Sequence, residues 1–440
     1  MQQILGHLSK EDLQTFKNSI NSPLLGGTHK HYSFLDTFYK AKGIIAMTPY
    51  NRVLMSELYK MCEKFIIIQA TLSDKVYSTV TLSRFFREVE DEKLFSSLYS
   101  ATGNATPKTA DDHAFMSQIE YEQWQFSQLK SRFSKMNFDR MVYHDDVSII
   151  SHKLKLMVNL LSQTHLTSTI INTSLTKTFM NLVESNGYTE VPCISMYYFA
   201  IKMMDEPENE SWFSKLQKGL SEFSDYFTHD ELKILLGQAI NYCIRQHNSG
   251  VRIYTEYLFD LYHKALDKDY LLTHGYLSRT TYRNINTIAI RLGMYTEAKN
   301  ISKTYKSKLR PEQRESAYSF NMANIYFAEG DHDSSLAELI NVELDDHLSN
   351  LFAKALQLKI YYETNNFRLL DAHLDAMQVY LTRKKIIGYH KTNYSNILKY
   401  TRKLMNLPTN DREARQKLGI KIQNEKILTD KEWLLKQCGV

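Results

Sequence analysis

Apolar side chains recur along most of the chain at the spacing of one helical face. One such stripe comprises Leu54, Leu58, Met61, Phe65 and Ile68. Thr48 and Pro49 precede it as a cap and a first helical residue. Ser9 similarly precedes a helix that ends at Ser22-Pro23. A loop over residues 101–112 and a polar, aromatic helix over Asp112–Phe133 follow. From about Val147 the pattern predicts pairs of helices with short joints.

The shortage of turn-forming residues favours the same fold class. The 440 residues include 15 Gly and 7 Pro, together 5% against a usual share of about 12%. A β-sandwich or barrel needs frequent turns, which depend on these residues, so an all-β fold is unexpected. With 43% hydrophobic residues, the chain has enough apolar surface for a core. The sequence therefore predicts an all-α protein.

The joints of the last predicted pairs recur at a nearly constant period. Gly293, Gly330 and Asn365 stand at equivalent positions, 37 and 35 residues apart. They define three units, residues 279–312, 316–349 and 351–384. Positions that favour small residues align between the units. On the first helices the position where neighbouring helices cross closely holds Asn286, Ala323 and Leu358, and on the second helices the small-residue position holds Ala298, Ser335 and Leu370. A period of this length is typical of stacked helix pairs.

Two stretches resemble known families. The segment Leu292–Ala298, in which a glycine ends one helix and a Glu-Ala pair follows, resembles the turn of tetratricopeptide repeats, whose period is 34 residues. This resemblance implies an α-solenoid of antiparallel helix pairs. Residues 8–16 (LSKEDLQTF), Ser22-Pro23, residues 54–59 (LMSELY) and residues 432–435 (EWLL) resemble a group of bacterial helical-repeat proteins with no assigned function. That second resemblance implies architecture and no activity.

The tetratricopeptide resemblance also implies a concave groove lined by the first helix of each unit. The side chains at its groove-facing positions are Arg283, Asn284, Thr287, Arg291, Phe320, Asn321, Asn324, Phe327, Lys359, Tyr362 and Glu363. Asparagine amides both donate and accept hydrogen bonds and could hold a peptide backbone. The cations could meet a carboxylate. The set lacks the family's Lys and Asn pairing within one unit for a chain-terminal carboxylate. The alternative is a solvated inner face.

The net charge of +5 is unevenly distributed. Residues 382–440 carry 14 Lys or Arg and 5 Asp or Glu, whereas residues 1–381 carry 40 and 44. The basic segment interleaves aromatic and cationic side chains at Tyr389, Lys391, Tyr394, Lys399, Tyr400, Arg402 and Lys403. This pattern allows nucleic-acid binding as an alternative to solvated terminal helices.

Motifs of catalysis and cofactor binding are missing. The sequence contains no phosphate-binding glycine loop, no Gly-x-Ser-x-Gly, no His-Glu-x-x-His and no CxxC pair. Four Asp/His clusters occur at predicted helix starts, where carboxylates cap free N–H groups: residues 111–113, 144–146, 331–333 and 345–347. A metal site built from two of them stays an open alternative. We expect no enzyme activity, no cofactor and no metal.

These patterns predict three parts: a helical N-terminal domain over residues 1–145, a tetratricopeptide-like α-solenoid over 146–405 and a basic helical cap over 406–440. The absence of a leader pattern and of long apolar runs favours a cytoplasmic protein without a membrane partner. The expected function is non-catalytic binding of a protein or peptide in the groove. The alternative, besides nucleic-acid binding, is a peptide-responsive regulator with the N-terminal bundle as its output module.

Overall fold

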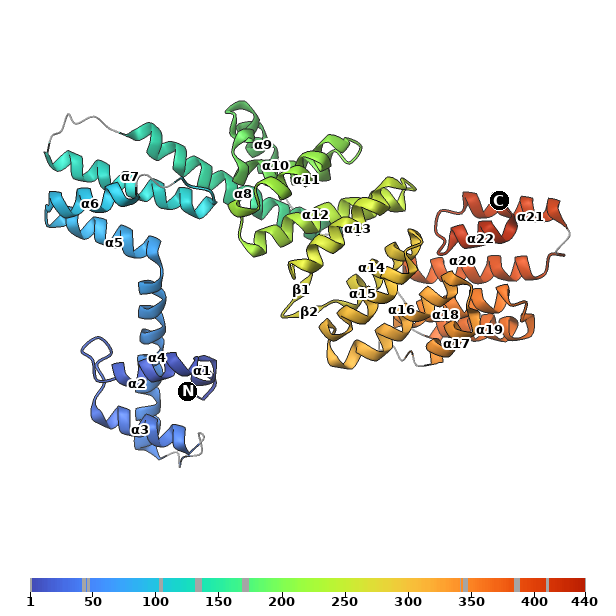
Figure 1. Ribbon diagram of the computed structural model, residues 1–440, viewed down its shortest axis with the longest axis horizontal. Coiled ribbons are helices and arrows are strands. Elements are labelled where there is room, and N and C mark those ends of the chain that lie inside the picture. Colours follow the sequence, from blue (N-terminus) through green and yellow to red (C-terminus); the bar gives the residue numbers. More distant parts are fainter. Residues whose placement is uncertain are drawn as a thin grey trace. The chain divides into compact units, whose positions relative to one another are not determined.

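The computed structural model describes residues 2–41, 45, 48–102, 106–130, 137–167, 174–340, 342, 347–383, 388–408 and 411–439. In this part of the chain the protein is all-α, with one short hairpin (Figure 1). The chain divides into two compact units, Met1–Tyr198 and Phe199–Val440. Across the described residues, no helix combines the length and apolar character needed to span a bilayer.

The first unit begins with a small bundle. Its helices are α1 (Gln2–His7), α2 (Lys10–Ser19), α3 (His29–Lys40) and α4 (Pro49–Ser73). The hydroxyl of Ser9 accepts the N–H of Asp12 at 3.0 Å, and that of Thr48 accepts the N–H of Asn51 at 3.2 Å. Both predicted caps are therefore confirmed. The predicted stripe on α4 is buried as far as Phe65, whose ring lies 5.3 Å from that of Phe16.

A second group of helices completes the first unit: α5 (Lys75–Glu88), α6 (Glu92–Thr102), α7 (Ala110–Lys130), α8 (Phe138–Thr167), α9 (Ser174–Ser185), the 3₁₀ turn η1 (Tyr188–Glu190) and the start of α10 (Pro192–Asp205). Helix α7 contacts α5, α6 and α8. The predicted domain boundary near residue 145 lies inside α8, and the division between the units lies at Tyr198 and Phe199 within α10. The sequence pattern missed this because α8 runs unbroken through residue 145.

The second unit contains the remaining elements. They are α11 (Glu210–Glu222), η2 (Ser224–Tyr226), α12 (His229–Asn248), α13 (Ile253–Asp267), β1 (Leu272–Thr273), β2 (Tyr276–Leu277), α14 (Arg279–Arg291), α15 (Tyr295–Tyr305), η3 (Lys306–Lys308), η4 (Pro311–Gln313), α16 (Arg314–Glu329), α17 (His332–Ile340), α18 (His347–Glu363), α19 (Phe367–Arg383), α20 (Gly388–Met405), α21 (Arg412–Asn424) and α22 (Lys431–Cys438). Strands β1 and β2 pair antiparallel around His274 and Gly275, whose φ angles are 52° and 80°.

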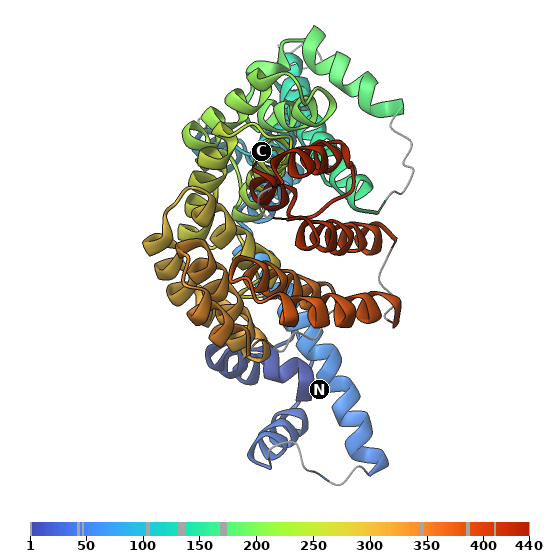
Figure 2. The same cartoon turned by 90° about the vertical axis from the view of Figure 1, so that its right-hand side faces the viewer.

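Successive helices of the second unit contact one another in chain order from α11 to α20 (Figures 1 and 2). In addition, the first helix of each pair contacts the first helix of the next, so that α14 meets α16, α16 meets α18 and α18 meets α20. One face of the second unit is thus built from alternate helices. Helices α20, α21 and α22 pack against α18 and α19 around a shared apolar cluster that includes Leu358, Leu374, Leu434 and Cys438.

Candidate functional site

The helix pairs α14/α15, α16/α17 and α18/α19 turn in the same way. Gly293, Gly330 and Asn365 all adopt the left-handed conformation, with φ of 73°, 84° and 56°. The N–H of the next residue then donates to the carbonyl five residues back, from Met294 to Ala289, from Asp331 to Tyr326 and from Asn366 to Tyr361, each at 2.9 Å. This is the Schellman arrangement, which closes a helix on a residue that tolerates positive φ. The predicted alignment of the three turns is confirmed.

Equivalent positions also meet between the two helices of a pair. Ala298, Ser335 and Leu370 are all fully buried, as are Ala323 and Leu358, and Asn286 is 1% exposed. In the second pair the Ser335 hydroxyl donates to the carbonyl of Ala323 at 2.7 Å. In the first pair the Asn286 amide approaches the carbonyl of Ala298 at 3.4 Å. The predicted crossing positions therefore lie in the contacts between paired helices.

The first helices of these pairs, α14, α16 and α18, carry the predicted groove residues. Thr287 and Arg291 are exposed, and six others are half-buried: Arg283, Asn284, Asn324, Phe327, Lys359 and Glu363. The Arg283 guanidinium stacks on the ring of Phe352, 4.0 Å from its centroid, and the Lys359 ammonium lies 5.2 Å from that of Phe327. Cations and aromatic rings from different first helices are therefore held together, in the geometry of cation–π contacts.

Three of the predicted groove residues are buried instead. Asn321 is 1% exposed, and its amide lies 3.4 Å from both the carbonyl of Tyr282 and the hydroxyl of Ser302. Phe320 and Tyr362 are each 8% exposed. The expectation that Asn321 faces a ligand is corrected here, because a buried amide must find partners and this one finds them in the neighbouring pair. Phe320 joins the apolar cluster between the second and third pairs.

Helix α22 covers the groove positions of the third unit. The ring of Tyr362 lies 5.5 Å from that of Trp433, edge to face. The indole N–H of Trp433 donates to Glu363 at 2.7 Å, and Glu363 also pairs with His332 at 3.3 Å. Lys359 forms an ion pair of 2.6 Å with Asp430, just before α22. Lys359, Tyr362 and Glu363, predicted as groove residues, therefore contact α22 and the residue before it within the chain.

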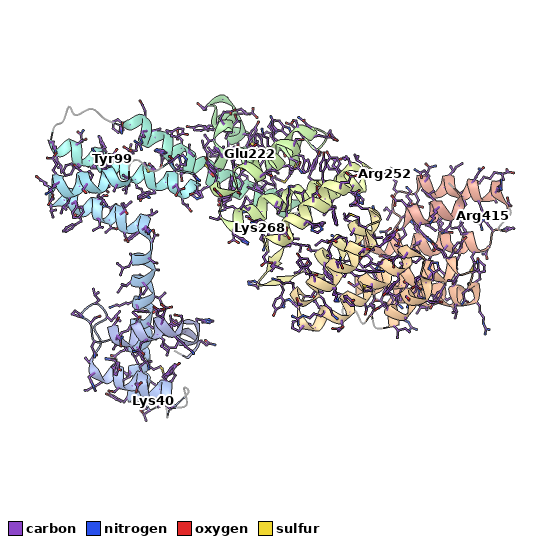
Figure 3. All side chains as sticks on the ribbon, viewed as in Figure 1. Lys40, Tyr99, Glu222, Arg252, Lys268 and Arg415 are labelled. Carbon is purple, nitrogen blue, oxygen red and sulfur yellow. The ribbon has the colours of Figure 1, made fainter. Side chains whose placement is uncertain are left out.

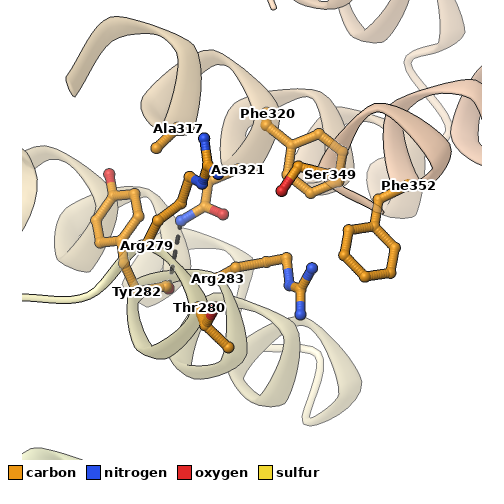
Figure 4. Close-up of a pocket in the computed structure, with 9 residues that line it drawn as sticks. All are labelled: Arg279, Thr280, Tyr282, Arg283, Ala317, Phe320, Asn321, Ser349 and Phe352. Atoms are coloured by element: carbon orange, nitrogen blue, oxygen red, sulfur yellow. Dashed lines mark hydrogen bonds between the residues drawn. The ribbon is translucent and has the colours of Figure 1, made fainter. Parts of the chain in front are cut away.

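Three of the predicted groove residues, Arg283, Phe320 and Asn321, line a small cavity between α14, α16 and α18 (Figure 4). Its lining comprises Arg279, Thr280, Tyr282, Arg283, Ala317, Phe320, Asn321, Ser349 and Phe352. The cavity volume of about 20 Å³ suits a single water molecule. A larger ligand would have to lie across the face above it.

The lining adds residues that the sequence prediction did not select. Thr280, Ala317 and Phe352 each hold the second position of their unit, three residues before Arg283, Phe320 and Ala355. That alignment could have identified them. The roles of Arg279 and Ser349 depend on how α14 and α18 approach α16, and no local pattern marks them.

Polar contacts within the chain hold several of the groove side chains. The Asn324 amide donates to the carbonyl of Phe320 at 2.8 Å, and the Thr287 hydroxyl donates to that of Arg283 at 2.9 Å. Arg291 donates to Nε2 of His247 on α12. Burial, followed by the charge of Arg291, lowers the pKa of His247, which favours the neutral ring that accepts this bond.

Two tyrosines of the basic C-terminal segment are buried. Tyr394 and Tyr400 are 2% and 4% exposed, and the Tyr400 hydroxyl donates to Glu425 at 2.9 Å. The side chain of Tyr389 lies outside the described residues. Base stacking needs open ring faces, so these tyrosines do not provide it. Lysines do gather at a hollow of about 410 Å³ between α20 and α21, formed in part by Lys403, Lys417 and Lys421.

The Asp/His clusters have different roles. Asp112 accepts the N–H groups of Lys108 and Thr109, and Asp331 accepts that of Ser334, so both act at helix starts as predicted. Residues 144–146 lie inside α8 and cap nothing, which corrects that prediction. Asp345 and Asp346 lie outside the described residues. Among the residues described, no three His, Cys, Asp or Glu side chains gather as metal ligands would.

Comparison with protein-family models and with curated proteins found no match. The functional interpretation therefore depends on the helix pairs and on the side chains of α14, α16 and α18.

Proposed function

We propose that residues 279–384 form a tetratricopeptide-like solenoid segment and that the protein is a non-catalytic scaffold that binds a peptide or protein partner. The observation that carries this proposal is the threefold recurrence of the αL-capped turn together with buried crossing positions at the same places in each pair. Stacked helix pairs present broad, preformed surfaces on which a partner loses little conformational entropy.

The partner surface that we propose comprises the first helices of the first two units. The third unit contributes Phe352 to this surface, whereas α22 covers the later groove positions of that unit, Tyr362 and Glu363. Helix α14 supplies three arginines to this surface: Arg279, Arg283 and Arg291. Guanidinium groups recognise carboxylates by paired hydrogen bonds. The preferred partner is therefore an extended segment with acidic side chains.

A selection from a random peptide display library against the full chain tests this proposal. We expect enrichment of acidic peptides, and a loss of affinity of about tenfold or more in the double variant R283A/N324A, as for removal of a charge-assisted hydrogen bond. K303A on α15 is the matched control, since Lys303 is exposed on the second helix of the first pair. Equal affinity of R283A/N324A and the unchanged chain contradicts the surface. Failure to select any peptide contradicts the function.

A further inference from the structure

Helix α5 has a second apolar face that nothing in the described chain covers. Val80 and Ser83 are buried on the side that meets α7, and Arg87 reaches Glu122 of α7 from the same side. Leu82, Phe85 and Val89 point the opposite way and are 46%, 54% and 53% exposed. A surface helix normally carries polar residues there. Contiguous exposed apolar patches of this kind mark interaction sites.

The spacing of the exposed residues matches a helix-packing seam. The exposed residues Leu82, Phe85 and Val89 follow Ser78, and the four are spaced at intervals of four, three and four residues. This is the a/d pattern with which one helix packs lengthwise against another. Ser78 itself is half-buried, and its hydroxyl donates to the carbonyl of Thr71 at 3.1 Å. We call the residues Ser78, Leu82, Phe85 and Val89 the α5 seam.

Charge distribution indicates which helix fits the seam. At the N-terminal end of α5, Asp74 accepts the N–H of Tyr77 as the helix cap, and Lys75 follows it. Glu88 and Glu90 lie at the C-terminal end. Among the described residues, Lys75, Glu88 and Glu90 form no ion pair. An antiparallel copy of α5 brings Lys75 of each chain to the acidic end of the other, whereas a parallel copy brings like charges together. Antiparallel helix dipoles favour the same choice.

We propose that the protein forms a homodimer in which the α5 seams of two copies pack antiparallel. Leu82 of one chain then opposes Phe85 of its partner, and Ser78 opposes Val89. The arrangement is isologous, because both chains use the same seam and each contact occurs twice, once on either side of the twofold axis. It uses a surface of the first unit and is independent of the peptide-binding proposal.

Sedimentation velocity of the full chain from about 1 to about 100 μM tests the proposal. We expect a concentration-dependent dimer, and F85E should raise the dissociation constant at least about 30-fold, as for loss of an interface hot spot. L156E is the matched control, because Leu156 is also apolar and 57% exposed but lies on α8. A far-UV circular dichroism spectrum checks that F85E is folded. A monomer at every concentration, or a dimer unaffected by F85E, overturns the proposal.

Disulfide formation tests the direction of packing. The four native cysteines, Cys62, Cys193, Cys243 and Cys438, are all buried. A disulfide between two chains therefore reports only the cysteines that are introduced. An equimolar mixture of S78C and V89C chains should form a cross-linked dimer on mild oxidation, since these positions oppose each other in the antiparallel pair. S78C by itself should not. Cross-linking of S78C with itself, or none in the mixture, overturns the antiparallel arrangement.

Discussion

Helices α5 to α8 of the first unit and helices α14 to α19 of the second are held together by different means. In the second unit, neighbouring pairs repeat one turn and one set of small or apolar crossing residues. In the first unit, buried carboxylates join helices that share no repeated pattern. Glu122 of α7 accepts Nε of Arg84 and Arg87 of α5 at 3.2 and 2.7 Å. The repeats are thus specified locally, whereas the first unit depends on single, long-range pairs.

Glu120 extends the contrast to two further helices. Its carboxylate is fully buried and accepts the hydroxyl of Tyr99 on α6 (labelled in Figure 3), the amide of Asn137 and Nε of Arg140 on α8. Burial and the neighbouring Glu120 raise the pKa of Tyr99. A buried charge is tolerated only where its partners are in place, so these contacts fix which helices pack together.

The largest expected effect comes from removing one such carboxylate. E122A leaves the guanidinium of Arg87 half-buried without its acceptor, and we expect a loss of about 3 to 5 kcal/mol in the stability of the first unit. Trp124 is the only tryptophan of residues 1–198. Urea unfolding followed by fluorescence in a W212F/W433F background therefore reports this unit.

The control for this variant is R84A. Arg84 contacts the same carboxylate, but its side chain is 57% exposed, so its removal should cost less than about 1 kcal/mol. Equal losses for E122A and R84A would mean that the carboxylate is not the element that specifies the packing of α5 on α7, and the contrast between the units would fail.

Acidification should weaken the first unit through a buried histidine pair. Nδ1 of His113 on α7 lies 3.0 Å from Nδ1 of His144 on α8, so one neutral ring donates to the other. Burial, followed by the charge of His144, lowers the pKa of His113 from 6.5 to about 4, while Asp112 opposes this shift. Burial and Arg140 lower the pKa of His144, while Glu120 opposes that shift.

The sign follows from proton uptake. Because the folded pKa of His113 lies below the unfolded value, the unfolded chain binds the proton first as pH falls. The stability of the first unit is therefore fully present above about pH 6.5. Below that pH it falls progressively toward pH 4, by up to about 3 kcal/mol for His113. Urea unfolding at several pH values measures it. H113F/H144F should flatten this slope, and H152Q, at an exposed position on α8, should not. An unchanged slope in H113F/H144F refutes the assignment.

Local signals in the sequence were sufficient for the helices, caps and turns. Ser9, Thr48 and the αL positions Gly293, Gly330 and Asn365 have the conformations that their residue types predict, because each depends on its immediate neighbours. The boundary expected near residue 145 lies inside α8, whereas the chain divides at Tyr198 and Phe199, for the opposite reason. A division between compact units depends on which helices pack together, and the buried pairs that decide this in the first unit join residues far apart in the chain.

The same reasoning explains the partial success at the groove. Alignment with the repeat placed Arg283, Thr287, Asn324 and Phe327 on the helices that form one face. It could not reveal that Asn321 bonds to the adjacent pair, nor that Trp433, 71 residues after Tyr362, packs against it. The spacing of the repeat carries no information about contacts with a segment that is far away in the sequence.

The smallest expected effect tests whether the repeated turns depend on local conformation alone. At Gly330 an added Cβ would meet no atom within 4 Å, but φ is +84°. G330A should therefore destabilise the second unit by about 1 to 2 kcal/mol through backbone strain only. Gly237, inside α12, also has open space around it and no positive φ, so G237A should stabilise the same unit by about 0.5 to 1 kcal/mol. Urea unfolding in a W124F background, where both remaining tryptophans lie in the second unit, measures the two changes. Changes of opposite sign in the unfolding free energies of G330A and G237A support local specification of the repeats. An unchanged unfolding free energy in G330A would mean that packing between the helix pairs stabilises the turn, as packing between helices does in the first unit.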